Sequence, residues 1–223
     1  DSTAIRYNSQ WLYKIDFELM LQLMSKFTVA RILERDDFRN RFSENKSIAL
    51  QEFLYPIMQA YDSVAIKADV ELGGNDQLFN LLAGRELMEK MDMDPQVCLT
   101  LPLLEGTDGV LKMSKSYGNY IGITDSPEDM FGKAMSIPDE LMIRYYRLCS
   151  TVPVEEIDAL EKALSLPEGD PNRLHPNKVK EGLAKNIVSS YYSKEAAERA
   201  REHFIKIVRN KELPDAIPEV TIE

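Results

Sequence analysis

Two lysines and two serines stand together in the stretch K-M-S-K-S at residues 112–116. A lysine ammonium binds phosphate as a point charge on a flexible stem, and a serine hydroxyl can donate a hydrogen bond to it. Gly106, Gly109 and Gly118 flank the stretch, and glycine adopts positive φ without a steric penalty. These residues predict a mobile loop that binds a departing polyphosphate. A solvated basic loop is the plainer alternative for any two lysines three residues apart.

A second group of polar side chains lies about 50 residues upstream. Tyr55, Gln59 and Asp62 have the spacing i, i+4 and i+7, which places them along one face of a predicted helix over 51–61. A phenol, an amide and a carboxylate can hold an ammonium group and accept a hydrogen bond from a hydroxyl. Ile57, Met58 and Ala60 can pack on the other side of the helix. A helix face in contact with solvent is the alternative for such a stripe taken alone.

A third motif, G-G-N-D-Q at residues 73–77, follows a predicted strand and opens a helix. Glycines at this point allow the backbone to approach a ligand, and free N–H groups at a helix start favour anions or ribose hydroxyls. Asn75 or Asp76 could instead serve only as the helix N-cap. This motif alone is therefore weak support for a ligand site.

The elements around the three motifs indicate an α/β fold. Apolar spacing predicts helices over 9–50 and 51–61, a β-rich run over 63–72, a helix through Leu87 and a strand over 97–104. Strand, glycine turn, helix and strand in this order indicate a parallel sheet. From Ser126-Pro127, a good helix start, the pattern is helical to about residue 207 and is broken at prolines. Residues 214–223 read as an extended linker.

Composition excludes several classes of protein. The net charge of −10 argues against a general coat for nucleic acid, although it allows a local basic site. Cys98 and Cys149 are predicted to be free buried thiols of a reducing compartment. The sequence has no metal-ligand spacing, because it has no C-x-x-C and His175 and His203 stand apart. No apolar run approaches membrane-spanning length and no signal segment is visible, so the sequence predicts a cytoplasmic protein.

Together, the motifs Y-P-x-x-Q-x-x-D at 55–62, G-G-x-D-Q at 73–77 and K-M-S-K-S at 112–116 resemble class I aminoacyl-tRNA synthetases, most closely the bacterial tyrosyl-tRNA synthetases. The resemblance extends from N-S-x-W-L at 8–12 and T-V-A at 28–30 to the closing I-P-E-V at 217–220. It implies the second half of a Rossmann-like parallel-sheet catalytic domain followed by an all-α anticodon-binding domain. The implied division is a helical connective and dimer-forming region at 1–50, the catalytic half at 51–126 and the anticodon-binding domain with its linker at 127–223.

The resemblance also implies a reaction, in which ATP activates L-tyrosine to tyrosyl-adenylate and tyrosine then passes to tRNA(Tyr). ATP would be a substrate accompanied by Mg²⁺, without a metal held by the protein, and the enzyme would be a homodimer. Carried over residue by residue, the resemblance implies that tyrosine is bound by Tyr55, Gln59, Asp62 and Gln77. It implies that Gly74 and Asp76 contact the ribose of the adenylate. The pyrophosphate would be bound by Lys112, Lys115 and Ser116, and Lys115 would also contact the nucleotide.

The chain departs from the family pattern in two places. The H-x-G-H element of the first half of the nucleotide fold is absent, because neither histidine has that context, and no C-terminal RNA-binding domain follows. We therefore expect a central fragment that is inactive alone. A tryptophanyl-tRNA synthetase is one alternative, which the double glycine and the hydroxyl acceptor Asp62 disfavour. The other is a non-catalytic helical module for dimerisation or tRNA binding, in which Lys178, Lys180 and Lys185 could contact an anticodon stem.

Overall fold

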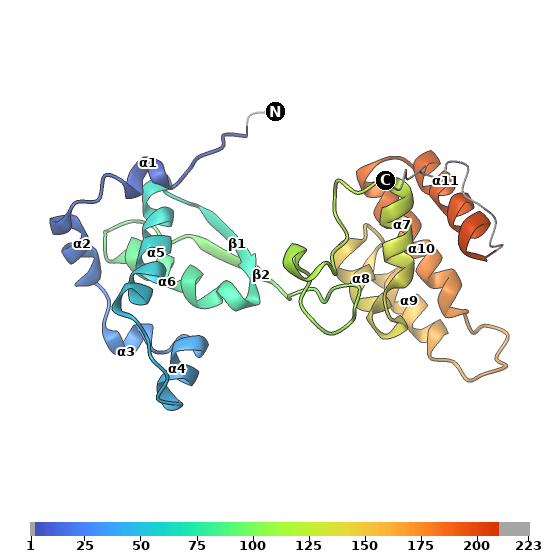
Figure 1. Ribbon diagram of the computed structural model, residues 1–223, viewed down its shortest axis with the longest axis horizontal. Coiled ribbons are helices and arrows are strands. Elements are labelled where there is room, and N and C mark those ends of the chain that lie inside the picture. The colour runs from blue at the N-terminus through green and yellow to red at the C-terminus, as the bar shows by residue number, and fades with distance from the viewer. Residues whose placement is uncertain (1–2, 210–223) are drawn as a thin grey trace, which may run out of the picture. The chain divides into compact units, whose positions relative to one another are not determined.

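A computed structural model describes residues 3–209 of the chain. The chain divides into two compact units, Asp1–Leu103 and Leu104–Glu223. Figure 1 shows α-helices around a small sheet in the first unit and helices in the second. The division expected from the sequence, after residues 50 and 126, follows functional regions and stays a prediction. The linker expected at 214–223 and the motif at 217–220 lie outside the described residues.

The N-terminal region is helical, as expected over 9–50, and its helices are four short ones. Asp16 caps one of them by accepting a hydrogen bond from the N–H of Leu19 at 2.8 Å, and Thr28 caps the next by accepting from the N–H of Arg31 at 3.1 Å. Each cap begins a separate helix, so the apolar residues of this region are divided among several short helices. The helices are α1 (Ser9–Leu12), α2 (Phe17–Met24), α3 (Val29–Ile32) and α4 (Asp36–Ser43).

The next helix, α5 (Leu54–Ile66), follows the 3₁₀ turn η1 (Leu50–Phe53) and is longer than expected. The β-rich run predicted over 63–72 was therefore wrong in its first half. A short apolar run does not distinguish a helix from a buried strand by its periodicity. The helix ends where Lys67 adopts a left-handed conformation with φ of +52°, and the amide of Ala68 bonds back to the carbonyl of Ser63 at 3.0 Å.

The described residues contain one sheet of two parallel strands, β1 (Val70–Gly74) and β2 (Val97–Leu101). Val70 lies opposite Val97 and Gly74 opposite Leu101. The turn η2 (Asn75–Gln77) and the helix α6 (Leu78–Glu89) connect the strands. The predicted order of strand, glycine turn, helix and strand is thus confirmed, although β2 ends at Leu101 and not at residue 104.

One face of this sheet carries apolar side chains that are exposed. Alternate residues of a strand point to the same side, and the exposed set consists of Val70, Leu72, Val97, Leu99 and Leu101. Leu72 is 71% exposed. Parallel sheets in proteins are almost always covered on both faces, and α6 packs against the strands from one side only. The other face of the sheet is therefore uncovered and could pack against another segment of polypeptide.

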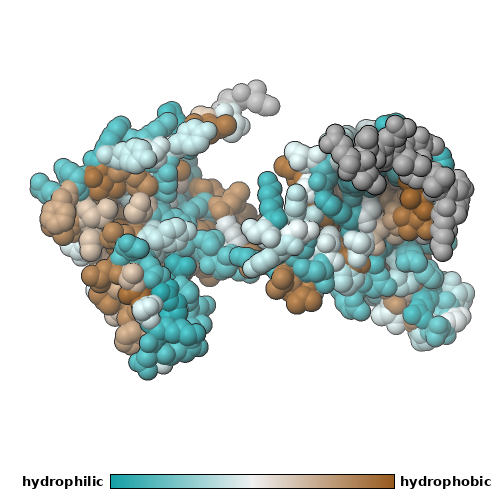
Figure 2. Space-filling view, viewed as in Figure 1, coloured by the Kyte–Doolittle hydropathy of each residue, from teal (hydrophilic) through white to brown (hydrophobic). Residues whose placement is uncertain are grey.

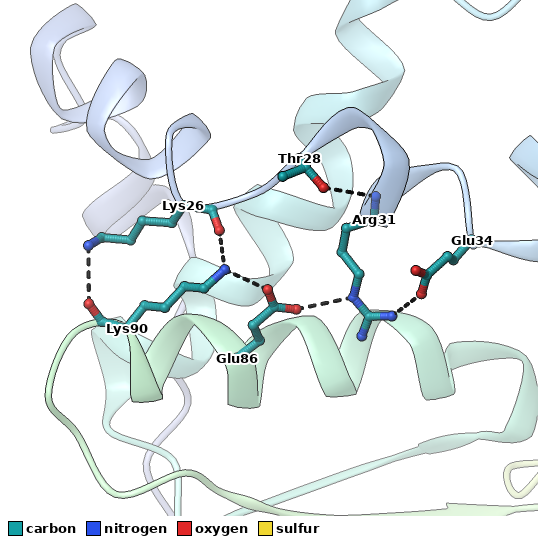
Figure 3. Close-up of polar contacts among 6 residues, drawn as sticks. All are labelled: Lys26, Thr28, Arg31, Glu34, Glu86 and Lys90. Carbon is teal, nitrogen blue, oxygen red and sulfur yellow. Dashed lines mark hydrogen bonds and ion pairs between the residues drawn. The ribbon is translucent and has the colours of Figure 1, made fainter.

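Polar contacts join the N-terminal helices to α6, as Figure 3 shows. Glu86 on α6 accepts from the guanidinium of Arg31 at 3.1 Å and from the ammonium of Lys90 at 2.6 Å. Two lysines add reciprocal bonds, because Lys26 donates to the carbonyl of Lys90 at 3.1 Å and Lys90 donates to the carbonyl of Lys26. The apolar core between these elements consists of Leu23, Ile32, Phe38, Ile57, Ala60, Ala83 and Leu87. Together these contacts fix α6, and with it the turn that precedes it.

The second unit contains the helices α7 (Pro127–Ser136), α8 (Met142–Cys149), α9 (Val154–Leu164), α10 (Pro176–Tyr191) and α11 (Lys194–Phe204). It also contains the 3₁₀ turns η3 (Lys115–Tyr117) and η4 (Asp139–Leu141) and the π-helical segment η5 (Ile205–Arg209). The predicted helix start is confirmed, because Ser126 caps α7 by accepting from the N–H of Asp129 at 3.1 Å and Pro127 is the first helical residue. The packing core of α7, α10 and α11 includes Phe131, Ala134, Leu183, Ala184, Ala197 and Ala200. Small residues allow the helices to approach closely.

Candidate functional site

The polar stripe predicted on α5 lines a pocket of the first unit. Tyr55, Gln59 and Asp62 share this pocket with Gln77, which lies at the end of η2. The pocket has a volume of about 470 Å³. The opposite side of α5 faces the core through Ile57 and Ala60, as expected, whereas Met58 lines the pocket instead. The residues predicted to bind one ligand are therefore neighbours in space.

Asp62 is held in place by two side chains that precede it by about 50 residues. The indole N–H of Trp11 donates to Asp62 Oδ1 at 2.7 Å, and the amide of Asn8 donates to Asp62 Oδ2 at 3.4 Å. The bond from Trp11 has the short length of a charge-assisted hydrogen bond and orients the carboxylate, while the longer bond from Asn8 contributes less. Each oxygen still has a lone pair for another donor. Asp62 is therefore an oriented hydrogen-bond acceptor at the wall of the pocket.

The indole donor provides a direct test of this orientation. Trp11→Phe removes the N–H that bonds to Asp62 and keeps an aromatic ring beside it. If the pocket takes tyrosine, as the sequence resemblance implies, we expect the variant to bind it about 3- to 10-fold more weakly, because a carboxylate that loses one fixed donor is less well aligned for the next. Isothermal titration of tyrosine into the full-length protein measures the change. Gln10→Ala, an exposed neighbour on the same short helix, is the control and should leave the affinity as it was.

The glycine motif forms the end of β1 and the turn η2. Gly74 precedes this turn in extended conformation, so neither Asn75 nor Asp76 is the N-cap that the sequence allowed. A Cβ on Gly74 would lie 2.5 Å from Asp76 Oδ1, so a side chain at this position would displace the carboxylate. Gln77 donates to Asp76 Oδ2 at 3.2 Å. This turn therefore places the carboxylate of Asp76 beside the backbone of Gly74, which has no side chain to cover it.

Asn80 on α6 fixes the amide of Gln77. Its Nδ2 donates to Gln77 Oε1 at 3.0 Å, and Asn80 itself is only 3% exposed. A carboxylate can only accept, so Asp76 requires the NH₂ end of Gln77 to face it, which leaves Oε1 for Asn80. The direction of this chain of hydrogen bonds is therefore determined by the charge of Asp76.

Several residues that line the pocket escaped the site prediction: Asn8, Leu12, Met58 and Glu71. Glu71 is a second carboxylate and accepts from the hydroxyl of Ser63 at 3.1 Å and from the amide of Gln96. A Glu in the middle of a strand of apolar and glycine residues was the signal that could have identified it. Asn8 and Trp11 gave a weaker signal: Asn8 is the N-cap residue of the short helix α1, and Trp11 lies three residues later on that helix.

The K-M-S-K-S stretch lies in the second unit, where it leads into the turn η3. Lys112, Lys115 and Ser116 are exposed. Met113 packs against the core of the helices, while the hydroxyl of Ser114 accepts from the N–H of Ser116 at 3.2 Å. The two lysines are thus free to reach a ligand from an anchored backbone.

The flanking glycines have different roles. Gly109 and Gly118 adopt the predicted positive φ of +74° and +67°. Gly106 does not adopt positive φ. Glycine is required there by steric contact, because a Cβ would lie 2.2 Å from the side-chain amide of Asn119. The loop is consequently more ordered than three flanking glycines suggested.

The helical lysines considered as tRNA contacts differ in accessibility. Lys180 is buried, donates to the carbonyl of Ile137 at 2.6 Å and pairs with Asp139 at 2.5 Å, so its expected exposure was wrong. Lys185 forms an ion pair with Glu198. Lys178 is exposed. The face of α10 is therefore less basic than its sequence indicates.

Residues 3–209 were also compared with the requirements of a metal site, a membrane-spanning helix and a reactive cysteine. No group of three or more His, Cys, Asp or Glu is placed to hold a metal ion, and no helix has the length and apolar character needed to cross a membrane. Cys98 and Cys149 are free and half-buried rather than fully buried. Burial raises the pKa of the Cys149 thiol to about 11, so it is protonated at neutral pH and a poor nucleophile.

Comparison with known proteins identifies the class. The family described as tRNA synthetases class I (W and Y) matches residues 1–209. The chain therefore belongs to the class I tRNA synthetases of the tryptophan and tyrosine family. A solved structure of a C-terminally truncated mitochondrial tyrosyl-tRNA synthetase from Aspergillus nidulans has a TM-score of 0.64 over 90% of this chain and 57% of that one, at 22% identity. This likeness shows the Rossmann-like α/β fold.

Within that family, the chain is similar to tyrosine–tRNA ligases. It is 53% identical to the tyrosine–tRNA ligase of Carboxydothermus hydrogenoformans over 99% of this chain and 52% of the relative. It is 52% identical to that of Thermotoga maritima over 99% of this chain and 54% of the relative. The chain thus spans about half the length of these curated relatives.

Proposed function

We propose that this chain is part of a tyrosine–tRNA ligase, which activates L-tyrosine with ATP and transfers it to tRNA(Tyr). The observation that carries the proposal is the single pocket shared by Tyr55, Gln59, Asp62 and Gln77. Its polar groups come from two different elements, α5 and η2, and fit the two ends of one amino acid. The identity of about 50% to tyrosine–tRNA ligases supports the same substrate.

In this proposal Asp62 accepts the hydrogen bond of the substrate's phenolic hydroxyl. Its two existing donors, Trp11 and Asn8, hold the carboxylate oriented before the substrate arrives. Tyr55 and Gln59 contact the α-ammonium, and Gln77 lies toward the carboxylate. The identity of about 50% to tyrosine–tRNA ligases favours tyrosine over tryptophan. Hydrogen bonding to Asp62 alone does not, because an indole N–H can also donate to this carboxylate, as that of Trp11 does.

The nucleotide binds at the neighbouring turn. Asp76 accepts hydrogen bonds from the ribose hydroxyls of the adenylate, and Gly74 allows the ribose to approach the backbone. ATP is a substrate and carries Mg²⁺ with it, without a metal site built from this chain. The tyrosine carboxylate attacks the α-phosphate and pyrophosphate leaves, so the chain supplies positioning and charge without a covalent intermediate.

The lysines of the K-M-S-K-S stretch stabilise the leaving pyrophosphate. Negative charge grows on its oxygens as the bond to the α-phosphate breaks, and Lys112 and Lys115 neutralise it while Ser116 donates a hydrogen bond. Because this charge is largest in the transition state, contacts from these side chains raise the rate more than they raise ground-state affinity.

The activity belongs to the longer protein in this proposal. The open apolar face of β1 and β2 supports this, since a parallel sheet needs a second covering layer. The test is tyrosine-dependent exchange of pyrophosphate into ATP, measured for residues 1–223 and for the full-length protein. We expect exchange only from the full-length protein. Robust exchange by residues 1–223 alone would contradict the fragment interpretation, and none from the full-length protein would overturn the proposed activity.

We also propose that the protein is a homodimer joined through the N-terminal helices. Phe17, Leu21 and Met24 lie at i, i+4 and i+7 on α2 and are exposed, although the opposite side of this helix is in the core. Figure 2 shows apolar side chains gathered over these helices. Exposed apolar patches of this kind mark protein interfaces.

Phe17→Asp tests the dimer. A carboxylate placed in an apolar interface leaves a buried charge unpaired, so we expect a monomer where the unaltered protein is a dimer. Sedimentation velocity of the full-length protein at several concentrations measures the change. Val154→Asp replaces another exposed apolar residue in the second unit and should leave the dimer intact. A monomeric unaltered protein would rule out the proposal.

The helices from residue 127 onward are proposed to bind the anticodon region of tRNA, in a cytoplasmic enzyme. Their bundle supports an independent docking module. Only local basic groups are available for this, since the chain has a net charge of −10 and Lys180 is buried.

A further inference from the structure

The K-M-S-K-S stretch is part of a small hairpin, residues 104–119, which we call the signature hairpin. Its two arms pair in antiparallel fashion through a bridge between Glu105 and Lys112. The N–H of Met113 donates to the carbonyl of Leu104 at 2.8 Å. The N–H of Gly106 donates to the carbonyl of Leu111, also at 2.8 Å. The first lysine of the motif is therefore in a paired segment.

Asp108 forms the turn between the two arms. Its Oδ1 accepts from the N–H groups of Val110 and Leu111 at 2.9 and 3.1 Å, and Gly109 supplies the positive φ that the turn requires. The N–H of Val110 and the amide of Asn119 hold the pKa of Asp108 below its usual range. The carboxylate is thus ionised at neutral pH and acts only as an acceptor.

One side chain from the end of the hairpin reaches back into it. Asn119 is 5% exposed. Its Oδ1 accepts from the N–H of Ser114 at 2.9 Å, and its Nδ2 donates to Asp108 Oδ2 at 2.7 Å and to the carbonyl of Lys112 at 3.2 Å. Its own carbonyl accepts from the N–H of Thr107 at 2.8 Å. A single buried residue therefore joins the first arm, the turn and the motif.

The rest of the hairpin leaves room for this side chain. A Cβ on Gly106 would lie 2.2 Å from the Asn119 amide, so only glycine allows the amide to sit between the arms. The amide also cannot be exchanged for a carboxylate without loss. A carboxylate at 119 could accept from Ser114 but would place a second negative charge against Asp108 and a lone pair against the carbonyl of Lys112.

We propose that Asn119 is a positioning residue that sets the backbone of Lys112 and Ser114, and thereby the origin of the lysine side chains that meet the pyrophosphate. This inference rests on the proposed function of Lys112 and Lys115. The side chain of Asn119 is buried and bonds within the hairpin. It fixes the backbone on both sides of Met113, whose side chain is anchored in the helical core. The side chains of the exposed lysines are flexible, but their backbone is fixed by Asn119. Less conformational entropy is therefore lost when the lysines bind phosphate.

The first experiment measures the hairpin itself and does not depend on catalysis. Asn119→Ala in residues 1–223 should accelerate amide hydrogen exchange in peptides from 104–119 and leave peptides from α7 to α11 unchanged. Asn172→Ala, an exposed asparagine in the same unit, is the control and should change neither. Unchanged exchange across 104–119 would overturn the proposal, and so would loss of protection throughout the helices, because Asn119 would then support the whole unit.

The second experiment measures positioning in the full-length protein. We expect Asn119→Asp to lower kcat for tyrosine-dependent pyrophosphate exchange about 10²-fold and to leave the KM for tyrosine within about twofold, since misplacement of reacting groups by about 1 Å has such an effect. Adding Asp108→Asn should restore at least about tenfold, because the new amide can donate to the carboxylate at 119.

Three results separate this inference from the proposed function. If Lys112→Ala and Lys115→Ala abolish exchange but Asn119→Asp does not, Asn119 has no positioning role. A loss of activity in Asn119→Asp that Asp108→Asn fails to restore would equally contradict the pairing that the inference requires. If both lysine variants keep full exchange activity, the proposed function of the loop fails, whatever the hydrogen-exchange result shows for the hairpin.

Discussion

Replacing Lys112 or Lys115 with alanine in the full-length protein should lower the rate of tyrosyl-adenylate formation by about 10²- to 10³-fold, the usual effect of removing one group that stabilises transition-state charge. The affinity for tyrosine should stay within about twofold, because tyrosine binds at a different set of side chains. Pre-steady-state measurement of adenylate formation, with separate titration of tyrosine, distinguishes the two quantities.

The structure supports this separation of rate and affinity. Both lysines are exposed and belong to the second unit, whereas the pocket with Tyr55 and Asp62 lies in the first. Lys162→Ala, an exposed lysine on α9, is the matched control and should leave the rate unchanged. An equal loss of rate and of tyrosine affinity would assign the lysines to folding or ground-state binding and contradict their proposed role.

Asp62→Ala should reduce the preference for tyrosine over phenylalanine by about 10²-fold. Two effects act in the same direction. Tyrosine loses a hydrogen bond to a charged acceptor, which contributes about 1.5 to 3 kcal/mol. Phenylalanine no longer covers a carboxylate whose remaining lone pairs it cannot satisfy. The ratio of kcat/KM for the two amino acids in pyrophosphate exchange measures the change.

The geometry around Asp62 sharpens this prediction. Trp11 and Asn8 already donate to the two carboxylate oxygens, so the substrate hydroxyl would be a third donor to a fixed acceptor. Asp94→Ala, an exposed carboxylate in the same unit, serves as the control for a change in net charge. A variant at Asp62 with unchanged selectivity would remove this residue from the proposed tyrosine pocket.

Much of the first unit could be predicted from local pattern. The alternation of strand, glycine motif, helix and strand gave β1, α6 and β2 in the correct order, and the i, i+4, i+7 stripe placed Tyr55, Gln59 and Asp62 on one face of α5. Both signals depend on periods of the backbone itself, 2 for strands and 3.6 for helices. The errors lie at boundaries, such as the first half of the run at 63–72, where a short apolar segment fits either period.

Partners distant in the chain could not be predicted. Nothing in the local sequence of Lys180 indicates that its ammonium is buried against the carbonyl of Ile137, and a lysine on a helix is usually assigned to solvent. The same holds for Asn119, since an asparagine after a glycine is typical of an ordinary turn. Its role arises only because residues 106, 108, 112 and 114 surround it in space.

By itself, the sequence determined the chemistry: which side chains can bind an ammonium, a hydroxyl, a ribose and a leaving pyrophosphate, and at what spacing they occur. The tertiary structure decided which of these groups are oriented and which are free. Trp11 fixes Asp62, Asn80 fixes Gln77 and Asn119 fixes the backbone of Lys112, while the lysine side chains stay exposed. The physical reason is that a hydrogen bond depends on distance and angle between groups brought together by packing, whereas residue type and periodicity are properties of the chain alone.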